Sequence, residues 1–383
     1  MSNKTLKLFF TVCALMLCGT LEAAPSGNGL QPGEMIPVYR QGESGSRFYR
    51  IPALAVCPDG TLVALADKRG DRMNDLPNTI SVVAKRSTDG GLTWSEAITV
   101  AQGDSARVLT YGDPALAVDP ASGRLVAVFS GDEGFWGSTK ERKAGFYVST
   151  SDDCGLTWSE PRSITHQIYQ KPWYGAFAAS GRMLACADGR LMFVANTRLS
   201  PRHELKDVYE FVCSSSDGGD TWTVLNPDGR TPANGIGNES KLVELADGTL
   251  IMSIRSKGHR RFARSTDGGR SWSADSVVND LVEPDCNGDI VTAVTASGRQ
   301  ILVHSLPANP DVRRDASLYF SADGGKTWPR VVRLCEGLSA YTSVAQLPDG
   351  TLGCLVEVGK WDGNIPGPDG FDIFFTRVAI PDM

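Results

Sequence analysis

The eight residues Ser87-Thr88-Asp89-Gly90-Gly91-Leu92-Thr93-Trp94 recur along this 383-residue chain. All five copies fit the pattern Ser-x-Asp-x-Gly-x-Thr/Ser-Trp, and the other four occupy residues 151–158, 215–222, 265–272 and 321–328. In a tight turn between two strands, Asp accepts hydrogen bonds from turn amides and Gly adopts positive φ without steric cost. The Trp then returns the chain to an apolar layer. Five copies indicate a repeat architecture.

A second series of turns alternates with the first. Its first member, Pro58-Asp59-Gly60-Thr61-Leu62, joins the apolar runs 53–57 and 62–66, and such a pattern predicts a β-hairpin. The series has six members, with glycines at Gly60, Gly123, Gly189, Gly248, Gly298 and Gly350. One hairpin plus one octapeptide turn makes about four strands per unit. The sequence therefore predicts an all-β fold, a six-bladed β-propeller of four-stranded antiparallel blades.

The sixth unit lacks its octapeptide. Residues 371–380 supply one more strand, and the chain then ends. The early apolar run 35–39 belongs to no unit of its own. We expect this N-terminal strand to pair into the sixth blade and close the ring, which would remove two open sheet edges.

The N-terminus has the pattern of a secretory signal peptide. Lys4 and Lys7 precede the apolar run 8–17, which is too short for a membrane span, and small residues follow at Ala23 and Ala24. We expect a signal peptide at residues 1–24 and a single domain at residues 25–383, in a secreted or periplasmic protein. Lipidation of Cys18, which would attach it to the cell surface, stays open, although Leu17 fits that motif poorly. No later apolar run is long enough to span a membrane.

Composition excludes several classes of function. The net charge of −6 and the absence of a long basic cluster argue against nucleic acid as a partner. Seven of the nine cysteines follow the signal segment, scattered and odd in number, which does not indicate a disulfide framework. No Cys-x-x-Cys or His-x-x-x-His arrangement predicts a metal site, and the four histidines are scattered. We expect no metal or cofactor.

Three arginines are not explained by the repeat. Arg50 precedes the first strand of the first unit in Tyr49-Arg50-Ile51-Pro52, and Arg255 follows an apolar strand. Arg313 and Arg314 stand together upstream of another strand. Taken alone, such residues are more often solvated charges at the rim of a fold.

The octapeptide turns, known as Asp boxes, together with Tyr-Arg-Ile-Pro and the later arginines, resemble the bacterial sialidases (exo-α-sialidases, neuraminidases) over almost all of the mature chain. The resemblance implies an arginine triad at Arg50, Arg255 and Arg313. Arg314 is the neighbouring alternative, but Arg313 has the family's spacing to Asp315 and Ser321. Guanidinium groups bind carboxylates in a bidentate way, and the sugar of these substrates carries a carboxylate on its anomeric carbon.

The resemblance also implies the residues of catalysis. Tyr341 matches the nucleophile and Glu239 its base, whereas a buried structural Tyr and a loop carboxylate are the alternative interpretations. A neutral phenol avoids repulsion by the substrate carboxylate, but with a pKa of about 10 it needs a base beside it. Asp75 matches the acid/base, with Asp71 as the competing choice, and its pKa would have to be raised for that role.

Further residues are implied to bind the substrate. Glu357 matches the carboxylate that orients the first arginine, and its alternative is a rim charge. Arg69 and Asp113 match contacts to the 4-hydroxyl and the N-acetyl side of the sugar. An apolar wall for the N-acetyl methyl group is expected from among Phe135, Trp136 and Trp173.

The implied function is a retaining exo-α-sialidase that hydrolyses terminal α-linked sialic acid from glycans through a tyrosyl-sialyl intermediate. We expect a monomer that acts on sialylated glycans. A trans-sialidase or an intramolecular trans-sialidase is the alternative of the same class, and a non-catalytic sialic-acid-binding propeller is the alternative of another class. A scaffold for protein assembly would leave the arginines unexplained. The preference among α2-3, α2-6 and α2-8 linkages is not readable from the sequence.

Overall fold

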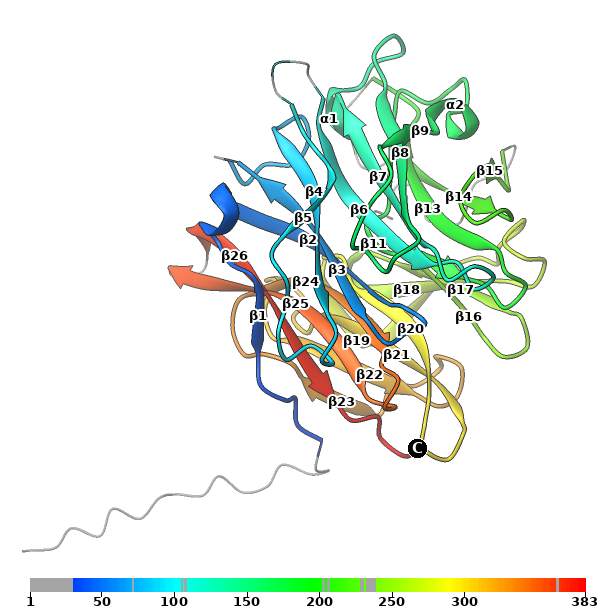
Figure 1. The fold of residues 1–383 in the computed structure, drawn as a ribbon. Helices are drawn as coiled ribbons and strands as arrows, with labels where there is room; N and C mark the ends of the chain where they lie inside the picture. Colours follow the sequence, from blue (N-terminus) through cyan, green and yellow to red (C-terminus); the bar gives the residue numbers. More distant parts are fainter. Residues whose placement is uncertain are drawn as a thin grey trace, which may run out of the picture.

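The structure, a computed structural model, is a ring of six β-sheets (Figure 1). It describes residues 30–70, 72–104, 106, 109–201, 204, 207–227, 231, 239–362 and 365–383. The segment 1–24, for which a signal peptide is expected, lies outside these residues, as does Asp71. No helix among the described residues is long and apolar enough to cross a membrane.

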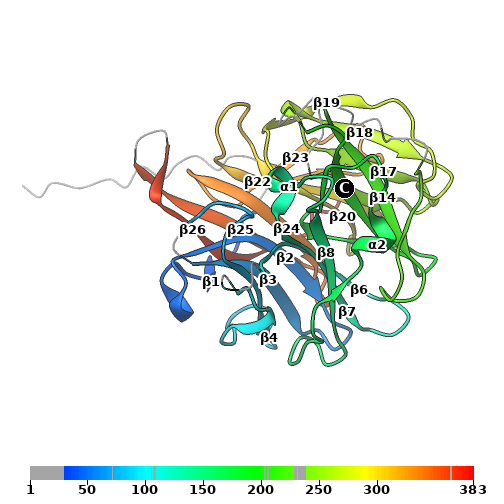
Figure 2. The ribbon, with the colours of Figure 1, turned by 90° about the horizontal axis from the view of Figure 1, so that it is seen from above.

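Each blade is one antiparallel sheet, and the first strands of the blades pack against one another at the centre of the ring (Figure 2). Blade I comprises β2 (Phe48–Val56), β3 (Leu62–Arg69), β4 (Ile80–Ser87) and β5 (Ile98–Ala101). Blade II comprises β6 (Tyr111–Val118), β7 (Leu125–Asp132), β8 (Ala144–Ser151) and β9 (Arg162–Ser163). Blade III comprises β10 (Gly175–Ala178), β13 (Leu191–Arg198), β14 (Val208–Ser215) and β15 (Thr223–Val224). Blade IV comprises β16 (Lys241–Glu244), β17 (Leu250–Ile254), β18 (Lys257–Ser265) and β19 (Ser276–Pro284). Blade V comprises β20 (Asp289–Val294), β21 (Gln300–Pro307), β22 (Ala316–Ser321) and β23 (Arg330–Arg333). Blade VI comprises β24 (Ser339–Gln346), β25 (Leu352–Asp362), β26 (Ile365–Val378) and β1 (Ile36–Tyr39). The predicted six-bladed propeller is confirmed.

The third blade departs from the regular pattern. Its innermost part is split into three short strands, which are β10, β11 (Gly181–Arg182) and β12 (Leu184–Ala185). The middle piece, β11, leaves its own blade and pairs in parallel with β6 of blade II, while β12 pairs with β13. Two sheets therefore carry a fifth short strand. The described helices are single turns: η1 (Glu43–Gly45), α1 (Gly134–Gly137) and α2 (Thr165–Ile168).

The ring closes through the N-terminal strand, as the sequence predicts. Strand β1 pairs antiparallel with β26, so the two ends of the chain share blade VI, and the blue β1 lies beside the red β26 in Figure 1. This pairing gives the last blade its fourth strand and covers the sheet edge that β26 would otherwise expose.

The five Asp boxes pack blades I to V each against the preceding blade of the ring. In the first copy, Ser87 Oγ accepts from the amide of Gly91 at 2.8 Å, and Asp89 Oδ1 accepts from the amide of Thr93 at 3.0 Å. A Cβ atom at Gly91 would lie 2.0 Å from the ring of Phe375 in blade VI, so only glycine fits there. The tryptophans of the boxes pack on the apolar layers between blades, and Trp222 and Trp328 are buried.

These turns predict a loss of stability in acid. The hydroxyls of Thr93 and Ser271 donate to Asp89 and Asp267, and these bonds lower the pKa of each carboxyl from the ordinary 3.8 to about 2. A carboxyl group whose pKa is lower in the folded than in the unfolded chain stabilises the fold at pH values above its unfolded pKa of 3.8. This stabilisation is lost as the pH falls towards the folded pKa of about 2. Asp67, whose pKa burial raises to about 6, is protonated in both states below 3.8 and does not contribute in that window.

We therefore expect the midpoint temperature of thermal unfolding to decrease as the pH is lowered from 4 to 2. Circular dichroism across this range measures it. Asp89→Asn should be less stable than the wild type at pH 7, and the difference should shrink in acid. A constant difference at all pH values would show that the charge of Asp89 contributes nothing.

Candidate active site

Seven of the nine predicted site residues line one cavity of about 180 Å³ on the axis of the ring: Arg50, Asp75, Asp113, Glu239, Arg255, Arg313 and Tyr341. They come from strands and loops of all blades but the third, at the end opposite the Asp-Gly hairpins. The other two, Arg69 and Glu357, are buried behind the cavity wall. The fold thus brings together residues separated by up to 291 positions in the sequence (50 to 341).

Three guanidinium groups surround the ring of Tyr341. The central carbons of Arg50 and Arg313 lie 5.1 and 5.6 Å from the ring centroid. Arg255 Nη1 donates to the Tyr341 hydroxyl at 3.3 Å. Three guanidinium groups that converge on one small cavity offer several hydrogen-bond donors to a carboxylate, so this arrangement favours an anionic ligand.

Glu357 fixes both Arg50 and Tyr341. Its two carboxylate oxygens accept from Arg50 Nε and Nη2 at 2.8 and 3.0 Å. The same oxygens accept from the backbone amides of Ile51 at 2.8 Å and Tyr341 at 3.0 Å. Because Glu357 is completely buried, it acts as an internal clamp rather than as a rim charge. We class it as a positioning residue.

Asp285, which the sequence analysis did not single out, holds the other two arginines. Its carboxylate accepts from Arg255 Nε at 2.7 Å, and its carbonyl accepts from Arg255 and from Arg313 at 2.8 and 3.0 Å. Arg314 points elsewhere: its Nε donates to Asp315 Oδ2 at 2.8 Å, and it does not line the cavity. The placement therefore favours Arg313 over Arg314 as the third arginine.

Tyr341 and Glu239, for which a chemical role is expected, are directly hydrogen-bonded to each other. The phenol donates to Glu239 Oε2 at 2.5 Å, and Arg255 Nη1 contacts the same oxygen. The pKa of Tyr341 is raised well above its usual value by burial and by Glu239. Burial also disfavours the Glu239 anion, but Arg255 and Lys241 outweigh this and lower its pKa. At neutral pH the pair is a protonated phenol beside a carboxylate.

A second group of polar residues orients Glu239 from behind. Ser180 Oγ and Asn287 Nδ2 donate to its other oxygen at 2.7 and 3.1 Å. Lys241 Nζ donates to Asn287 Oδ1 at 2.8 Å. Sequence reasoning missed these residues, because Ser180 and Asn287 lie in unremarkable stretches between strands and carry no motif.

Asp75 is placed differently from the other carboxylates. Its side chain is 72 % exposed and reaches over the cavity, where Arg69 Nη2 contacts its Oδ1 at 2.7 Å. Arg69 is buried and also donates to Asp67 and to the carbonyl of Met73. The expected contact of Arg69 with the sugar stays a prediction; in the structure its guanidinium holds the exposed carboxylate of Asp75.

Asp113 lies beside this pair with a strained backbone. Its φ is 57°, and its amide donates to Asp67 Oδ1 at 3.0 Å. The pKa of Asp113 is raised well above its usual value by burial and by its neighbours Asp67 and Asp75. A neutral carboxylic acid at this position has a proton with which to donate a hydrogen bond to a ligand.

Strained backbone concentrates around the cavity. Four non-glycine residues at or beside it, Ile51, Asp113, Glu239 and Asp285, have φ between 57° and 62°. Each such residue costs on the order of 1–3 kcal/mol and persists only where surrounding contacts hold it, which is typical of functional sites. The sequence contains no signal for this strain.

One side of the cavity is apolar. It is lined by Phe135, Trp136 and Phe177, of which Phe135 packs edge-on against the other two rings. Trp173, the third candidate for this wall, is completely buried in the core between blades II and III, where apolar packing outcompetes the surface. Phe177 on β10 takes its place, and the sequence did not indicate it.

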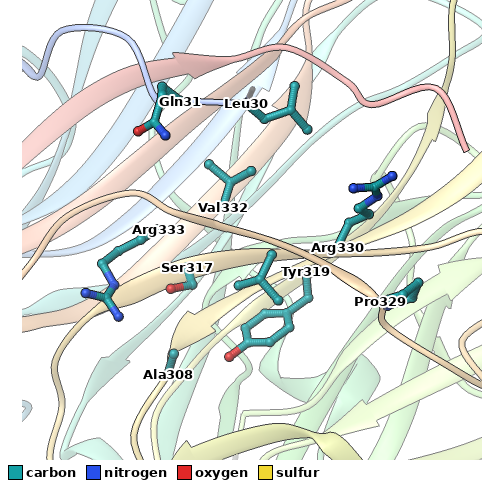
Figure 3. Close-up of a pocket in the computed structure, with 10 residues that line it drawn as sticks. Leu30, Gln31, Ala308, Ser317, Tyr319, Pro329, Arg330, Val332 and Arg333 are labelled. Atoms are coloured by element: carbon teal, nitrogen blue, oxygen red, sulfur yellow. The ribbon is translucent and has the colours of Figure 1, made fainter. Parts of the chain in front are cut away.

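A larger hollow of about 660 Å³ lies beside the outer strand of blade V (Figure 3). Arg330, Arg333 and Tyr319 line it together with Leu30 and Gln31 from the N-terminal segment. No carboxylate is among the described residues that line it. Although this hollow is larger than the cavity, it is therefore not the candidate active site.

Comparison with known proteins agrees with the repeat pattern. Residues 60–354, more than half of the chain, match the family described as BNR repeat-like domain. The chain belongs to this family. It is 35 % identical over 358 residues to a sialidase of Micromonospora viridifaciens, covering 88 % of this chain and 53 % of that protein. It is 28 % identical over 356 residues to a sialidase of Bacteroides fragilis, covering 87 % and 64 %.

Among solved structures, the fold is similar to that of the Hadza microbial sialidase Hz136, with a TM-score of 0.78 and 27 % identity. That match covers 90 % of this chain and 68 % of the other. This BNR-family chain spans less than two thirds of the length of the two curated sialidases above. Its activity is therefore argued from its own site.

Proposed function

We propose that this protein is a retaining exo-α-sialidase that hydrolyses terminal α-linked sialic acid from glycans. The observation that carries the proposal is the hydrogen bond of 2.5 Å between Tyr341 Oη and Glu239 Oε2, enclosed by three guanidinium groups. Its similarity to named sialidases supports the same class of substrate.

Substrate binding follows from the charges. The sugar carboxylate would bind between Arg50, Arg255 and Arg313, which places the anomeric carbon near the Tyr341 hydroxyl. The apolar side formed by Phe135, Trp136 and Phe177 suits the methyl of an N-acetyl group. Neutral Asp113 can donate a hydrogen bond to a sugar oxygen, and Asp75 at the open side faces the leaving group.

In the first step, Tyr341 Oη bonds to the anomeric carbon while its proton passes to Glu239. The bond to the glycosidic oxygen breaks, and Asp75 is the general acid that gives that oxygen a proton once the bound substrate shields its carboxyl group from water. Because the pKa of the buried phenol is raised and that of Glu239 is lowered, the proton rests on Tyr341 before reaction. Its transfer is therefore coupled to attack on the sugar rather than completed beforehand.

In the second step, the Asp75 carboxylate takes a proton from a water molecule, which attacks the anomeric carbon. The bond to Tyr341 breaks, and Glu239 returns the proton to the phenol oxygen. Two displacements at one carbon retain its configuration. The open position of Asp75, 72 % exposed, admits both water and a leaving glycan.

The test is release of sialic acid from 3′- and 6′-sialyllactose, with the anomer followed by NMR. Release of the α-anomer supports the retaining hydrolase. An anhydro product or transfer of the sugar to lactose would indicate an intramolecular trans-sialidase or a trans-sialidase. Binding of sialyllactose without turnover would leave a glycan-binding propeller and refute the enzyme.

The choice between the two adjacent arginines gives a matched prediction. Arg313→Met should lower kcat/KM for sialyllactose by roughly 10- to 100-fold, since a lost hydrogen bond to a charged group costs about 1.5–3 kcal/mol. Arg314→Met removes the same charge one residue away and should change kcat/KM by less than about threefold. Steady-state kinetics at fixed ionic strength decide the matter, and a reversed order would assign the role to Arg314.

A further inference from the structure

Two cysteines and an aspartate converge at the end of the ring opposite the cavity. Cys57 directly follows β2, Asp59 belongs to the Asp-Gly hairpin turn, and Cys154 belongs to the Asp box of blade II. One ligand atom from each lies within 4.8 Å of the other two. Cys57 is seven residues along the strand from Arg50, or roughly 20 Å. The cluster has no part in the proposed catalysis.

Cys154 departs from the repeat that surrounds it. The equivalent residue in the other four Asp boxes is glycine, with φ between 67° and 75°, at Gly90, Gly218, Gly268 and Gly324. Cys154 has φ 55°, a left-handed conformation that is strained for a non-glycine residue. The turn thus carries a side chain where glycine would be less strained.

The fold aims that side chain at the neighbouring blade. A Cβ atom at Gly218 would lie 3.3 Å from Asp119 Oδ2, and one at Gly324 would lie 3.7 Å from Leu245. The amide of Cys57 donates to the carbonyl of the residue that follows the hairpin glycine, and the amides of Asp119 and Leu245 do the same in their own hairpins. Asp119 and Leu245 are therefore equivalent to Cys57 in the repeat. The repeat geometry therefore places Cys154 opposite Cys57. Among the described blades, only the junction of blades I and II has a cysteine at both of these positions.

The spacing suits a tetrahedral metal centre. Metal–sulfur and metal–oxygen bonds of about 2.3 and 2.0 Å at a tetrahedral angle place the two ligand atoms about 3.5 Å apart. Cys154 Sγ and Asp59 Oδ1 are separated by 3.5 Å. Two sulfur ligands favour a thiophilic ion such as Zn²⁺ over Ca²⁺ or Mg²⁺, which prefer oxygen. Asp59 is exposed and Cys154 is half-buried, so an ion and a water ligand can enter from solvent.

We propose that Cys57, Asp59 and Cys154 bind one thiophilic divalent cation of the Zn²⁺ type, which clasps blades I and II together. Binding forms two metal–sulfur bonds and one metal–oxygen bond, and each thiol releases its proton to solvent. The guanidinium of Arg86, whose Nε donates to the carbonyl of Cys154 at 2.6 Å, offsets part of the negative charge of the ligands. The site would stabilise the ring at the junction where one Asp box carries a strained residue.

The experiment titrates the reduced, metal-free full chain with Co²⁺ and then Zn²⁺. We expect one equivalent of Co²⁺ with a thiolate charge-transfer band, and a rise in the unfolding midpoint on adding Zn²⁺. In Cys154→Gly, which restores the residue of the other boxes, the band should vanish. Zn²⁺ affinity should fall by at least the ~10- to 100-fold that losing an outer-shell partner costs.

Cys186→Ala is the matched control, because Cys186 holds the hairpin position of Cys57 in blade III, where the facing box residue is Gly268. This variant should bind Co²⁺ like the wild type. Absence of the band from the wild type, or its persistence in Cys154→Gly, would overturn the proposal. A disulfide between Cys57 and Cys154 would also overturn the proposal. It would be detected in the unreduced protein as the loss of two hydrogens in mass and as a cross-linked peptide that contains both residues.

Discussion

Replacing Tyr341 with phenylalanine is expected to lower kcat for sialyllactose by ~10³-fold or more while leaving KM within a few-fold of the wild type. The substitution removes only the hydroxyl that donates to Glu239. The ring stays among Ile51, Cys286 and Leu338, and keeps its contacts with Arg50 and Arg313. Of the arginines that would bind the carboxylate, Arg255 loses only its 3.3 Å contact with the hydroxyl and keeps its bonds to Asp285. No atom remains, however, to form the covalent bond.

Tyr319→Phe is the matched control for this result. It makes the same chemical change in a largely buried tyrosine of blade V, beside the larger hollow rather than the cavity. Its kcat should equal that of the wild type. If Tyr341→Phe also retained most of the turnover, water rather than Tyr341 would be the nucleophile, and the released sugar would be the β-anomer.

Glu239→Gln tests the other half of the pair. The amide keeps the shape of the side chain but cannot accept the phenol proton, so kcat should fall by roughly 10²–10⁴-fold. Because the two residues act as a unit, the double variant Tyr341→Phe with Glu239→Gln should be no slower than the slower single variant. Additive losses in single-turnover kinetics would show that Glu239 acts independently of Tyr341.

The architecture was predictable because each repeat carries its own turn chemistry. Ser, Asp and Gly of the Asp box determine a hairpin from local contacts alone, and six Asp-Gly or Ser-Gly turns count the blades. The closure by β1 followed from counting strands. The split inner strand of blade III did not, since β11 pairs with another blade through contacts that no local pattern encodes.

The candidate site was predictable only where a resemblance supplied positions. Seven residues that line the cavity came from that source, and the structure brings them together, whereas Phe177 was not indicated. The residues that hold them in place, namely Asp285, Ser180, Asn287 and Asp67, have no motif, because their function depends on contacts between distant segments. Trp173 shows the converse: an aromatic ring that suits a sugar packs instead in the core between two blades.

Asp75→Asn should separate the acid from the nucleophile. With sialyllactose, whose leaving group is a sugar alkoxide, kcat/KM should fall by roughly 10²–10⁴-fold, the usual contribution of a general acid. With a nitrophenyl sialoside the leaving group departs without a proton, so formation of the sialyl-enzyme should be much less affected. Asn has the shape of Asp and can still accept from Arg69, and the exposed position of residue 75 means that no core packing is lost.

The same variant also lacks the base that activates water in the second step. With the nitrophenyl substrate we therefore expect a burst of nitrophenol equal to the enzyme concentration, followed by slow turnover. Mass spectrometry of the quenched enzyme should then find the sugar on a peptide that contains Tyr341. Equal losses on both substrates, with no burst, would mean that Asp75 positions the sugar and transfers no proton, and another group would have to supply the acid.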